Sequence, residues 1–205
     1  MAERLYLYPL WLRLWHAINA LMFLVLIATG ISMQYSNPDA PLIRFDLAVS
    51  YHNIAGVIVS INYLIFLAGN LATGNGRHYR IMFEGFFKRL IQQMDYYLRG
   101  HFKKEKAPFP VTSERKFNPL QQATYVGTMY LLVPLIIITG LALLFPETIA
   151  NRIGNFSGIY LTALLHATVG FLLSLFLVIH LYFCTMGATP LSNFKGMASG
   201  WHEPH

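Results

Sequence analysis

The sequence is poor in charged residues and has a single cysteine. Only 12% of its 205 residues are Asp, Glu, Lys or Arg, whereas 55% are hydrophobic and the mean hydropathy is +0.46. This balance is typical of a membrane protein rather than a soluble one. The lone Cys184 excludes an internal disulfide and any metal or cluster site built from four cysteines.

The sequence is rich in long apolar runs. A transmembrane helix needs ~20 consecutive apolar residues to cross ~30 Å of hydrocarbon. Four runs are long enough, and they span residues 10–33, 47–71, 120–145 and 158–186. They use most of the chain and leave no room for a separate soluble domain. We therefore expect an all-α fold, an integral membrane four-helix bundle that forms one domain over residues 1–205. The first run is read as a retained helix and not as a signal peptide.

Positive charge is concentrated in one connection. The loop of residues 72–119 holds ten of the fifteen Lys and Arg residues, whereas the other two connections hold only Arg44 and Arg152. Basic loops stay in the cytoplasm by the positive-inside rule, so we expect this loop and both termini to be cytoplasmic. Membrane topology accounts for the net charge of +6, and no nucleic-acid partner is implied.

The basic loop also contains an apolar pattern. Between Tyr79 and Phe102, apolar residues recur at steps of three and four and alternate with basic ones. This pattern predicts an additional amphipathic helix that lies on the cytoplasmic membrane surface. Gly74, Gly76 and Gly100 would bound it.

Four histidines lie inside the apolar runs, namely His16, His52, His166 and His180. An ionisable side chain at membrane depth is costly and is a functional-site hypothesis by default. His166 and His180 are fourteen residues apart, so they share a helix face about 21 Å apart along the axis. The expected topology places His52 and His166 near the outer side and His16 and His180 near the inner side. Each pair could bind one metal between facing helices.

Small residues follow the histidines at a spacing of four. These are Gly56 after His52 and Gly170 after His166, with Ala20 and Cys184 in the same relation to the other two. A small residue on the same helix face lets a flat ligand approach the backbone. Zinc would require clustered ligands with Cys or carboxylate among them, so haem iron fits better. The chain has no C-x-x-C-H motif, so the haem would be non-covalent haem b, and two axial histidines would restrict it to electron transfer.

Arg13 is a charged residue near one of these histidines, and its position has two possible explanations. Arg13 lies one turn before His16 and could neutralise a haem propionate, or it could extend to the membrane surface and follow the charge rule. The other histidines lie in loops or the tail and are expected to be solvated; they are His78, His101, His202 and His205.

Several short motifs in a fixed order resemble one family over nearly the whole chain. They are Arg13-Leu-Trp-His16 with Thr29-Gly30, His52-Asn-Ile-Ala-Gly56, Lys116-Phe-Asn118-Pro-Leu-Gln121 with Thr139-Gly140, and His166 to His180 followed by Tyr182. In these motifs the chain resembles the prokaryotic b-type cytochrome subunits of formate dehydrogenase, nickel–iron hydrogenase and thiosulfate reductase complexes. The tail of residues 185–201 is most similar to the thiosulfate-reductase-type branch.

The resemblance implies two b haems held by the same helix pairing. It implies a membrane anchor for an iron–sulfur subunit and a catalytic subunit on the outer face, and electron exchange with menaquinone or ubiquinone near the inner haem. The residues that match the quinone site are Asn118 and Gln121. Pro119 and Leu120 replace small residues of the formate dehydrogenase branch, which implies a narrower pocket or a different quinone. The alternative role for Asn118 and Gln121 is polar capping of the third helix.

Three alternatives to this respiratory-subunit hypothesis stay open. The first keeps the haems but passes electrons between quinol and a multihaem cytochrome c, and co-purified subunits would discriminate it. The second is a non-haem transporter or structural anchor, which predicts no bound haem. The third is a metal reductase that acts alone at the outer haem, and reduction of a soluble metal chelate would identify it.

Overall fold

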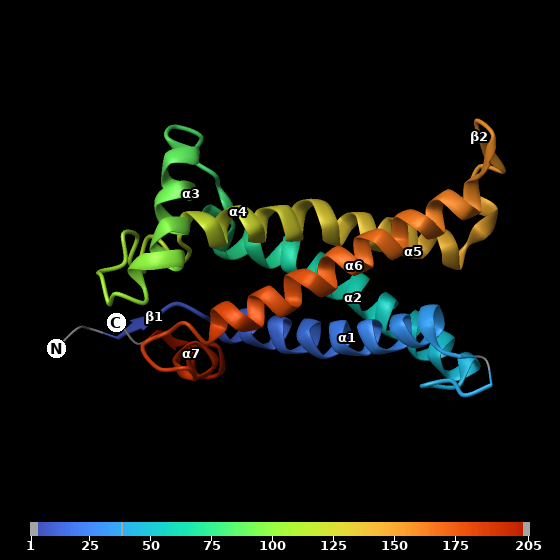
Figure 1. Cartoon of the computed structure of the whole chain (residues 1–205), viewed down its shortest axis with the longest axis horizontal. Coiled ribbons are helices and arrows are strands. Elements are labelled where there is room, and N and C mark those ends of the chain that lie inside the picture. The colour runs from blue at the N-terminus through green and yellow to red at the C-terminus, as the bar shows by residue number, and fades with distance from the viewer. Residues whose placement is uncertain (1–3, 38, 203–205) are drawn as a thin grey trace.

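Four long helices form the molecule, which we describe from a computed structural model that places residues 4–37 and 39–202 (Figure 1). Within the described residues, four spans are long and apolar enough to cross a membrane. They are α1 (Leu10–Tyr35), α2 (Phe45–Thr73), α6 (Gly158–Cys184) and a composite third span over Pro119–Leu144. The expected all-α membrane bundle is confirmed, and the predicted helix ends differ from the observed ones by only one or two residues.

The third span is not a continuous α-helix. It consists of α4 (Pro119–Gly127), a π-helical turn η3 (Thr128–Leu132) and α5 (Val133–Leu144). The N–H of Val133 donates to the carbonyl of Thr128, five residues back. Pro134 follows directly, and it has no N–H and crowds the carbonyl four residues before it. The wider π turn is the local adjustment that lets the span continue past this proline.

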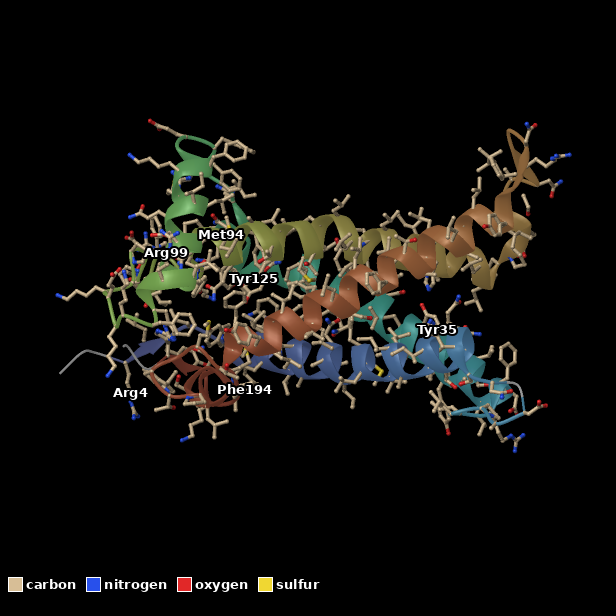
Figure 2. All side chains as sticks on the ribbon, viewed as in Figure 1. Arg4, Tyr35, Met94, Arg99, Tyr125 and Phe194 are labelled. Atoms are coloured by element: carbon tan, nitrogen blue, oxygen red, sulfur yellow. The ribbon has the colours of Figure 1, made fainter. Side chains whose placement is uncertain are left out.

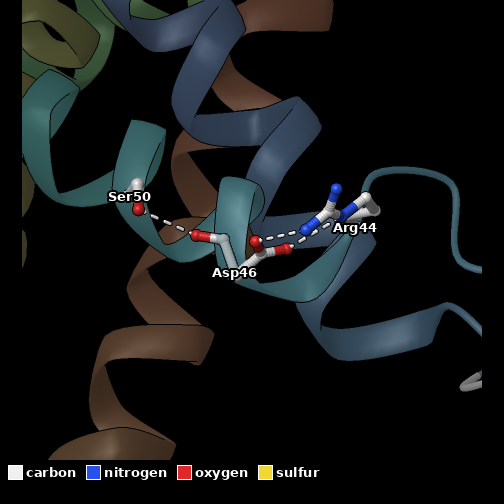
Figure 3. Close-up of polar contacts among 3 residues, drawn as sticks. All are labelled: Arg44, Asp46 and Ser50. Atoms are coloured by element: carbon white, nitrogen blue, oxygen red, sulfur yellow. Dashed lines mark hydrogen bonds and ion pairs between the residues drawn. The ribbon is translucent and has the colours of Figure 1, made fainter.

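Local interactions and backbone geometry define the two ends of α2. At its start, the carboxylate of Asp46 accepts hydrogen bonds from Arg44 Nη2 (2.7 Å) and Nε (3.2 Å), and the hydroxyl of Ser50 donates to the Asp46 carbonyl (Figure 3). This ion pair is exposed and contributes little stability. At its end, Gly74 adopts a φ of 66°, the left-handed conformation that glycine favours at a helix C-terminus.

A short helix in the basic loop runs crosswise to the bundle (Figure 1). It is α3 (Phe86–Asp95), and it continues into the π-helical turn η2 (Tyr96–Gly100). Figure 2 shows Met94 on the side of α3 toward the spans, and Arg99 farther along, in η2. Several apolar side chains of this helix are exposed, as the amphipathic prediction requires; they are Phe87, Ile91, Met94 and Leu98.

The amphipathic helix is shorter than the predicted range of residues 79–102. Residues Asn75–Tyr79 form a 3-10 helix, η1, and the chain then turns at Gly85, whose φ is 60°. The α-helix therefore begins only at Phe86. The apolar residues before it continue the pattern in sequence but not in structure.

The first and last described segments of the chain meet at the same end of the bundle as α3 (Figure 1). Strand β1 (Leu5–Tyr6) pairs antiparallel with β4 (Trp201–His202), and α7 (Ser192–Ser199) packs beside them. We call this end the basic end, because it carries every Lys and Arg except Arg44 and Arg152. The opposite, distal end carries the connections between spans, η4 (Pro146–Thr148) and the hairpin of β2 (Arg152–Ile153) and β3 (Phe156–Ser157).

The interior of the bundle is small and partly polar. Trp15 of α1 stacks on the fully buried Phe66 of α2, with ring centroids 4.7 Å apart. Trp15 Nε1 donates to the Asn62 carbonyl (2.9 Å), and Asn62 Nδ2 donates back to the Trp15 carbonyl (3.1 Å). These bonds fix the rotation of α1 against α2. Elsewhere the long helices expose apolar side chains, as surfaces that contact lipid do.

Candidate haem sites

The four histidines of the spans meet as two pairs. His16 of α1 faces His180 of α6 near the basic end, with ring centroids 6.3 Å apart. His52 of α2 faces His166 of α6 in the distal half, with centroids 6.2 Å apart. Within residues 4–37 and 39–202, no three His, Cys, Asp or Glu side chains converge as a metal site. The histidines therefore form two facing pairs, and each pair could hold a ligand between its two rings.

The ring separations fit one metal ion per pair. An imidazole nitrogen binds a first-row metal at about 2 Å, and the ring centre lies about 1 Å behind that nitrogen, so two ligands in line place their centroids about 6 Å apart. The observed separations match this value. A Cβ built on Gly56 would meet no atom within 4 Å, and one built on Gly170 would meet only Ile136 Cδ1 at 3.9 Å. Space for a flat ligand therefore lies beside the distal histidines.

Two threonines orient the distal histidines. Thr29 Oγ1 lies 2.9 Å from His52 Nδ1, and Thr139 Oγ1 lies 3.0 Å from His166 Nδ1. Each hydroxyl also donates to the carbonyl four residues back in its own helix, at 2.7 Å and 2.8 Å. A hydroxyl has one proton, so its oxygen accepts the Nδ1–H of the histidine. Both Nε2 atoms are then unprotonated and available to iron.

A glycine follows each of these threonines, and the ring of the histidine lies over it. A Cβ on Gly30 would lie 3.6 Å from His52 Cε1, and a Cβ on Gly140 would lie 3.1 Å from His166 Cε1. The Thr-Gly pairs were visible in the sequence as part of the family resemblance, but their contact with the histidines was not. The equal roles of Thr29 and Thr139 could have been suspected from their repetition on two spans.

The basic-end pair has different neighbours. The ring of Phe176 stacks on His180 at 5.7 Å, and Tyr125 of α4 lies edge-on at 6.0 Å. Cys184 Sγ lies 3.7 Å from His180 Nε2. These contacts are mostly apolar, so they pack the imidazole without directing its protons.

Arg13 lies at the basic end one turn before His16. Its Nη1 donates to the carbonyl of Ala198 in α7, and its Nε is buried and has no hydrogen-bond partner in the part of the chain that the structure describes. An unpartnered buried donor beside the basic-end pair is consistent with an anionic group of the ligand, such as a haem propionate. The arginine is also bound to α7, so it holds the chain ends together.

Asn118 and Gln121 form the capping box of α4. The backbone N–H of Gln121 donates to Asn118 Oδ1 (2.9 Å), and the backbone N–H of Asn118 donates to Gln121 Oε1 (3.2 Å). Asn118 Nδ2 also donates to the hydroxyl of Tyr97 in η2 (2.7 Å). The ring of Tyr97 packs on Phe183, three residues after His180, at 4.7 Å. The predicted capping role of Asn118 and Gln121 is therefore observed. The contacts through Tyr97 and Phe183 also link Asn118 to the region of the basic-end histidines.

Sequence analysis did not identify Tyr97 or Gln93 as part of this region. Burial raises the pKa of Tyr97, and the hydrogen bond from Asn118 opposes this shift. Gln93 of α3 is 2% exposed, and its Oε1 has no hydrogen-bond partner among residues 4–37 and 39–202. Both residues lie on the buried side of the amphipathic helix. The signal in the sequence that could have identified them was the presence of polar residues on the buried side of the helical pattern.

The prediction that His78 is solvated is wrong. His78 is 6% exposed and belongs to η1, which is tucked against the ends of α2 and α4. Desolvation, together with the charges of Lys116 and Arg77, lowers the pKa of His78 to about 4. Lys116 Nζ donates to Asn75 Oδ1 (2.7 Å) and closes this cluster. Of the other loop histidines, His101 and His202 are half-buried, and His205 lies outside the described residues.

The fold and the histidine pairs define a class, the membrane helical bundles that hold a metal cofactor between facing histidines. The chain belongs to the prokaryotic cytochrome b561 family, whose model matches residues 7–200. The chain is also 39% identical over 202 residues to YdhU of Escherichia coli (strain K12), which is named as a cytochrome. The match covers 98% of this chain and 76% of YdhU. No solved structure matches the chain significantly.

Family membership confirms the resemblance found in the sequence, at the level of the prokaryotic cytochromes b of the nickel–iron hydrogenase type. The protein is a multi-pass membrane cytochrome b. It therefore binds haem b and transfers electrons.

Proposed function

We propose that this cytochrome is a di-haem membrane anchor subunit of a respiratory oxidoreductase. It passes electrons between a partner at the distal end and menaquinone or ubiquinone at the basic end. The observation that carries this proposal is the presence of two histidine pairs at different depths, each with the ring separation that one iron requires. One haem would need only one such pair.

The histidines would hold the two haems in line along the bundle. His52 and His166 form one site and His16 and His180 the other, and α6 contributes a ligand to both. A haem gripped by two imidazoles supplies a one-electron carrier with no free coordination position. Fourteen residues of α6 separate its two ligands by about 21 Å, which is most of the hydrocarbon thickness. Gly56 and Gly170 leave room for the distal ligand, and Arg13 would pair with a propionate at the basic end.

The quinone would bind beside the basic-end pair. Asn118 is tied to Tyr97, which packs one turn of α6 beyond His180. The buried Oε1 of Gln93 has no partner and could accept a hydrogen bond from a reduced quinone. The concentration of Lys and Arg at this end supports a cytoplasmic orientation. Protons for quinone chemistry would then be exchanged with the cytoplasm.

The partner at the distal end would be an iron–sulfur subunit together with its catalytic subunit. A multihaem cytochrome c is the alternative electron partner. Affinity purification from membranes under mild detergent, followed by identification of the co-purified chains, decides between them.

Haem counting tests the di-haem proposal. The purified wild type is expected to give two b haems per chain by pyridine haemochrome, and His52→Ala and His180→Ala are each expected to lose one. His101→Ala is the matched control, since its half-buried side chain lies in the basic loop, and it should retain both haems. One haem per chain in the wild type would overturn the di-haem arrangement.

A further inference from the structure

The two histidine pairs differ in how their protons are held. In each distal imidazole, Nδ1 lies within hydrogen-bonding distance of a threonine hydroxyl. Because that hydroxyl donates its one proton to the carbonyl four residues back, the imidazole is assigned as the donor of Nδ1–H. In the described part of the chain, no hydroxyl forms a hydrogen bond with His16 or His180, and beside its aromatic neighbours His180 has a weakly polar contact from its Nε2 to the thiol of Cys184. The asymmetry is therefore built into the spans.

We propose that Thr29 and Thr139 are positioning residues that make the distal haem the lower-potential one of the two. This inference rests on the proposed di-haem function. A hydrogen bond from the outer nitrogen of an imidazole raises the basicity of the nitrogen that binds the metal. A more strongly donating ligand stabilises ferric over ferrous iron, and hydrogen bonding around the ligands is a recognised control of haem potential.

The location of the threonines strengthens this effect. Thr29 is 2% exposed and Thr139 is 5% exposed, so water does not compete for the Nδ1 protons. Hydrogen bonds are electrostatically stronger in such a low-dielectric interior. Thr29 comes from α1 and Thr139 from α5, so both histidines that would hold the distal haem have the same hydrogen-bond partner. The close approach over Gly30 and Gly140 keeps the rings in place.

The consequence is a direction for electron flow. Two electrons would pass one at a time from the reduced partner through the distal site to the basic-end site, and with two protons they would reduce one quinone to quinol. No bond would form or break in the transfer between the two sites. A lower potential at the distal site makes this internal step favourable. The polar groups near the basic-end pair lie at the candidate quinone site, and their contact with His180 is indirect.

Redox titration of threonine variants tests the proposal. Thr29→Val and Thr139→Val keep the shape of the side chain and remove the acceptor. Each is expected to raise one of the two midpoint potentials, and to change the ferric low-spin EPR signal of the same haem, while the other haem is unchanged. The double variant should show the larger shift, and Thr29→Ser should restore the wild-type potential.

Thr168→Val is the matched control. Thr168 also donates to the carbonyl four residues back in a span, but it forms no hydrogen bond with a histidine among the described residues. It should leave both potentials unchanged. If two haems are present and the Val variants alter neither the potentials nor the EPR signals, the inference is overturned while the di-haem function stands.

Single-haem variants supply a second test that does not depend on folding of the threonine variants. His180→Ala retains only the distal haem, and His52→Ala retains only the basic-end haem. The haem in His180→Ala is expected to titrate at the lower potential. The reverse order would overturn the proposal, whereas absence of two haems from the wild type would overturn the proposed function itself.

Discussion

Single atoms decide how the histidines of this cytochrome are held. The distal rings lie over glycines and are bonded to threonines, whereas the basic-end rings are packed by aromatic side chains. Sequence alone identified the four histidines, because an ionisable group in an apolar run is conspicuous. It could not identify the Thr29–His52 contact, because those residues are 23 positions apart on different helices.

Gly140 offers a residue-scale test of the distal pair. A methyl group at this position would lie 3.1 Å from His166 Cε1, so the ring of His166 must move. Gly140→Ala is expected to lower the occupancy of one haem, measured by pyridine haemochrome and by the reduced-minus-oxidised spectrum. Gly127→Ala in the same span meets no atom within 4 Å and should retain both haems. Equal haem content in the two variants would contradict the observed packing of the ring.

Burial of His78 predicts acid sensitivity. Its pKa falls from an ordinary value near 6.5 to about 4, so the folded protein favours the neutral ring. The unfolded chain binds a proton below pH 6.5, and stability is therefore lost as pH falls from 6.5 toward 4. At pH 5 the loss from this group is about 2 kcal/mol at most. Lys116, whose pKa is lowered to about 8, stays protonated throughout this window.

The thermal midpoint of the detergent-solubilised protein at pH 7 and pH 5 measures this effect. His78→Gln is expected to show a smaller drop between the two values than the wild type. Since every carboxylate is common to both proteins, the difference isolates His78. An identical drop in both would show that the ring is not buried neutral.

Elements were predictable where a local pattern defines them. The four spans follow from apolar length. The predicted amphipathic helix began seven residues too early, because η1 and the turn at Gly85 interrupt the pattern. Helix α7 and the β1–β4 pair were not predicted, since they depend on contact between the two chain ends.

The η2 turn carries an element-scale prediction for quinone chemistry. Tyr97→Phe removes the hydroxyl that accepts from Asn118. We expect a several-fold loss of quinone-dependent electron transfer in membranes or liposomes, with both haems retained and still reduced by dithionite. Tyr96→Phe, one residue earlier, is the control and should keep full activity. Loss of haem in Tyr97→Phe would instead indicate a structural role.

The whole molecule is polarised from end to end. The basic loop, α7 and the described chain ends gather at one end of the molecule. Of the Lys and Arg residues, only Arg44 and Arg152 belong to the connections at the other end. This asymmetry allows one end to serve a quinone and the other an electron partner. The bundle itself keeps the two histidine pairs at fixed depths.

Cysteine labelling tests the orientation of the molecule. In a Cys184→Ser background, Lys106→Cys in the basic loop should react with a membrane-impermeant maleimide only after the inner side is opened. Asn155→Cys in the distal hairpin should react in intact cells. The opposite labelling pattern would place the basic end outside and reverse the proposed path of protons.

The sequence by itself determined the spans, the uneven distribution of Lys and Arg, and the position of each histidine along its span. These properties depend on the thickness and charge preferences of the membrane, which act on each segment separately. Only the tertiary structure decided that Thr29 and Thr139 contact the Nδ1 atoms of the distal histidines, that His78 is buried, and that Tyr97 binds Asn118. Those contacts join residues far apart in the chain, and they depend on how each helix is rotated against its neighbours.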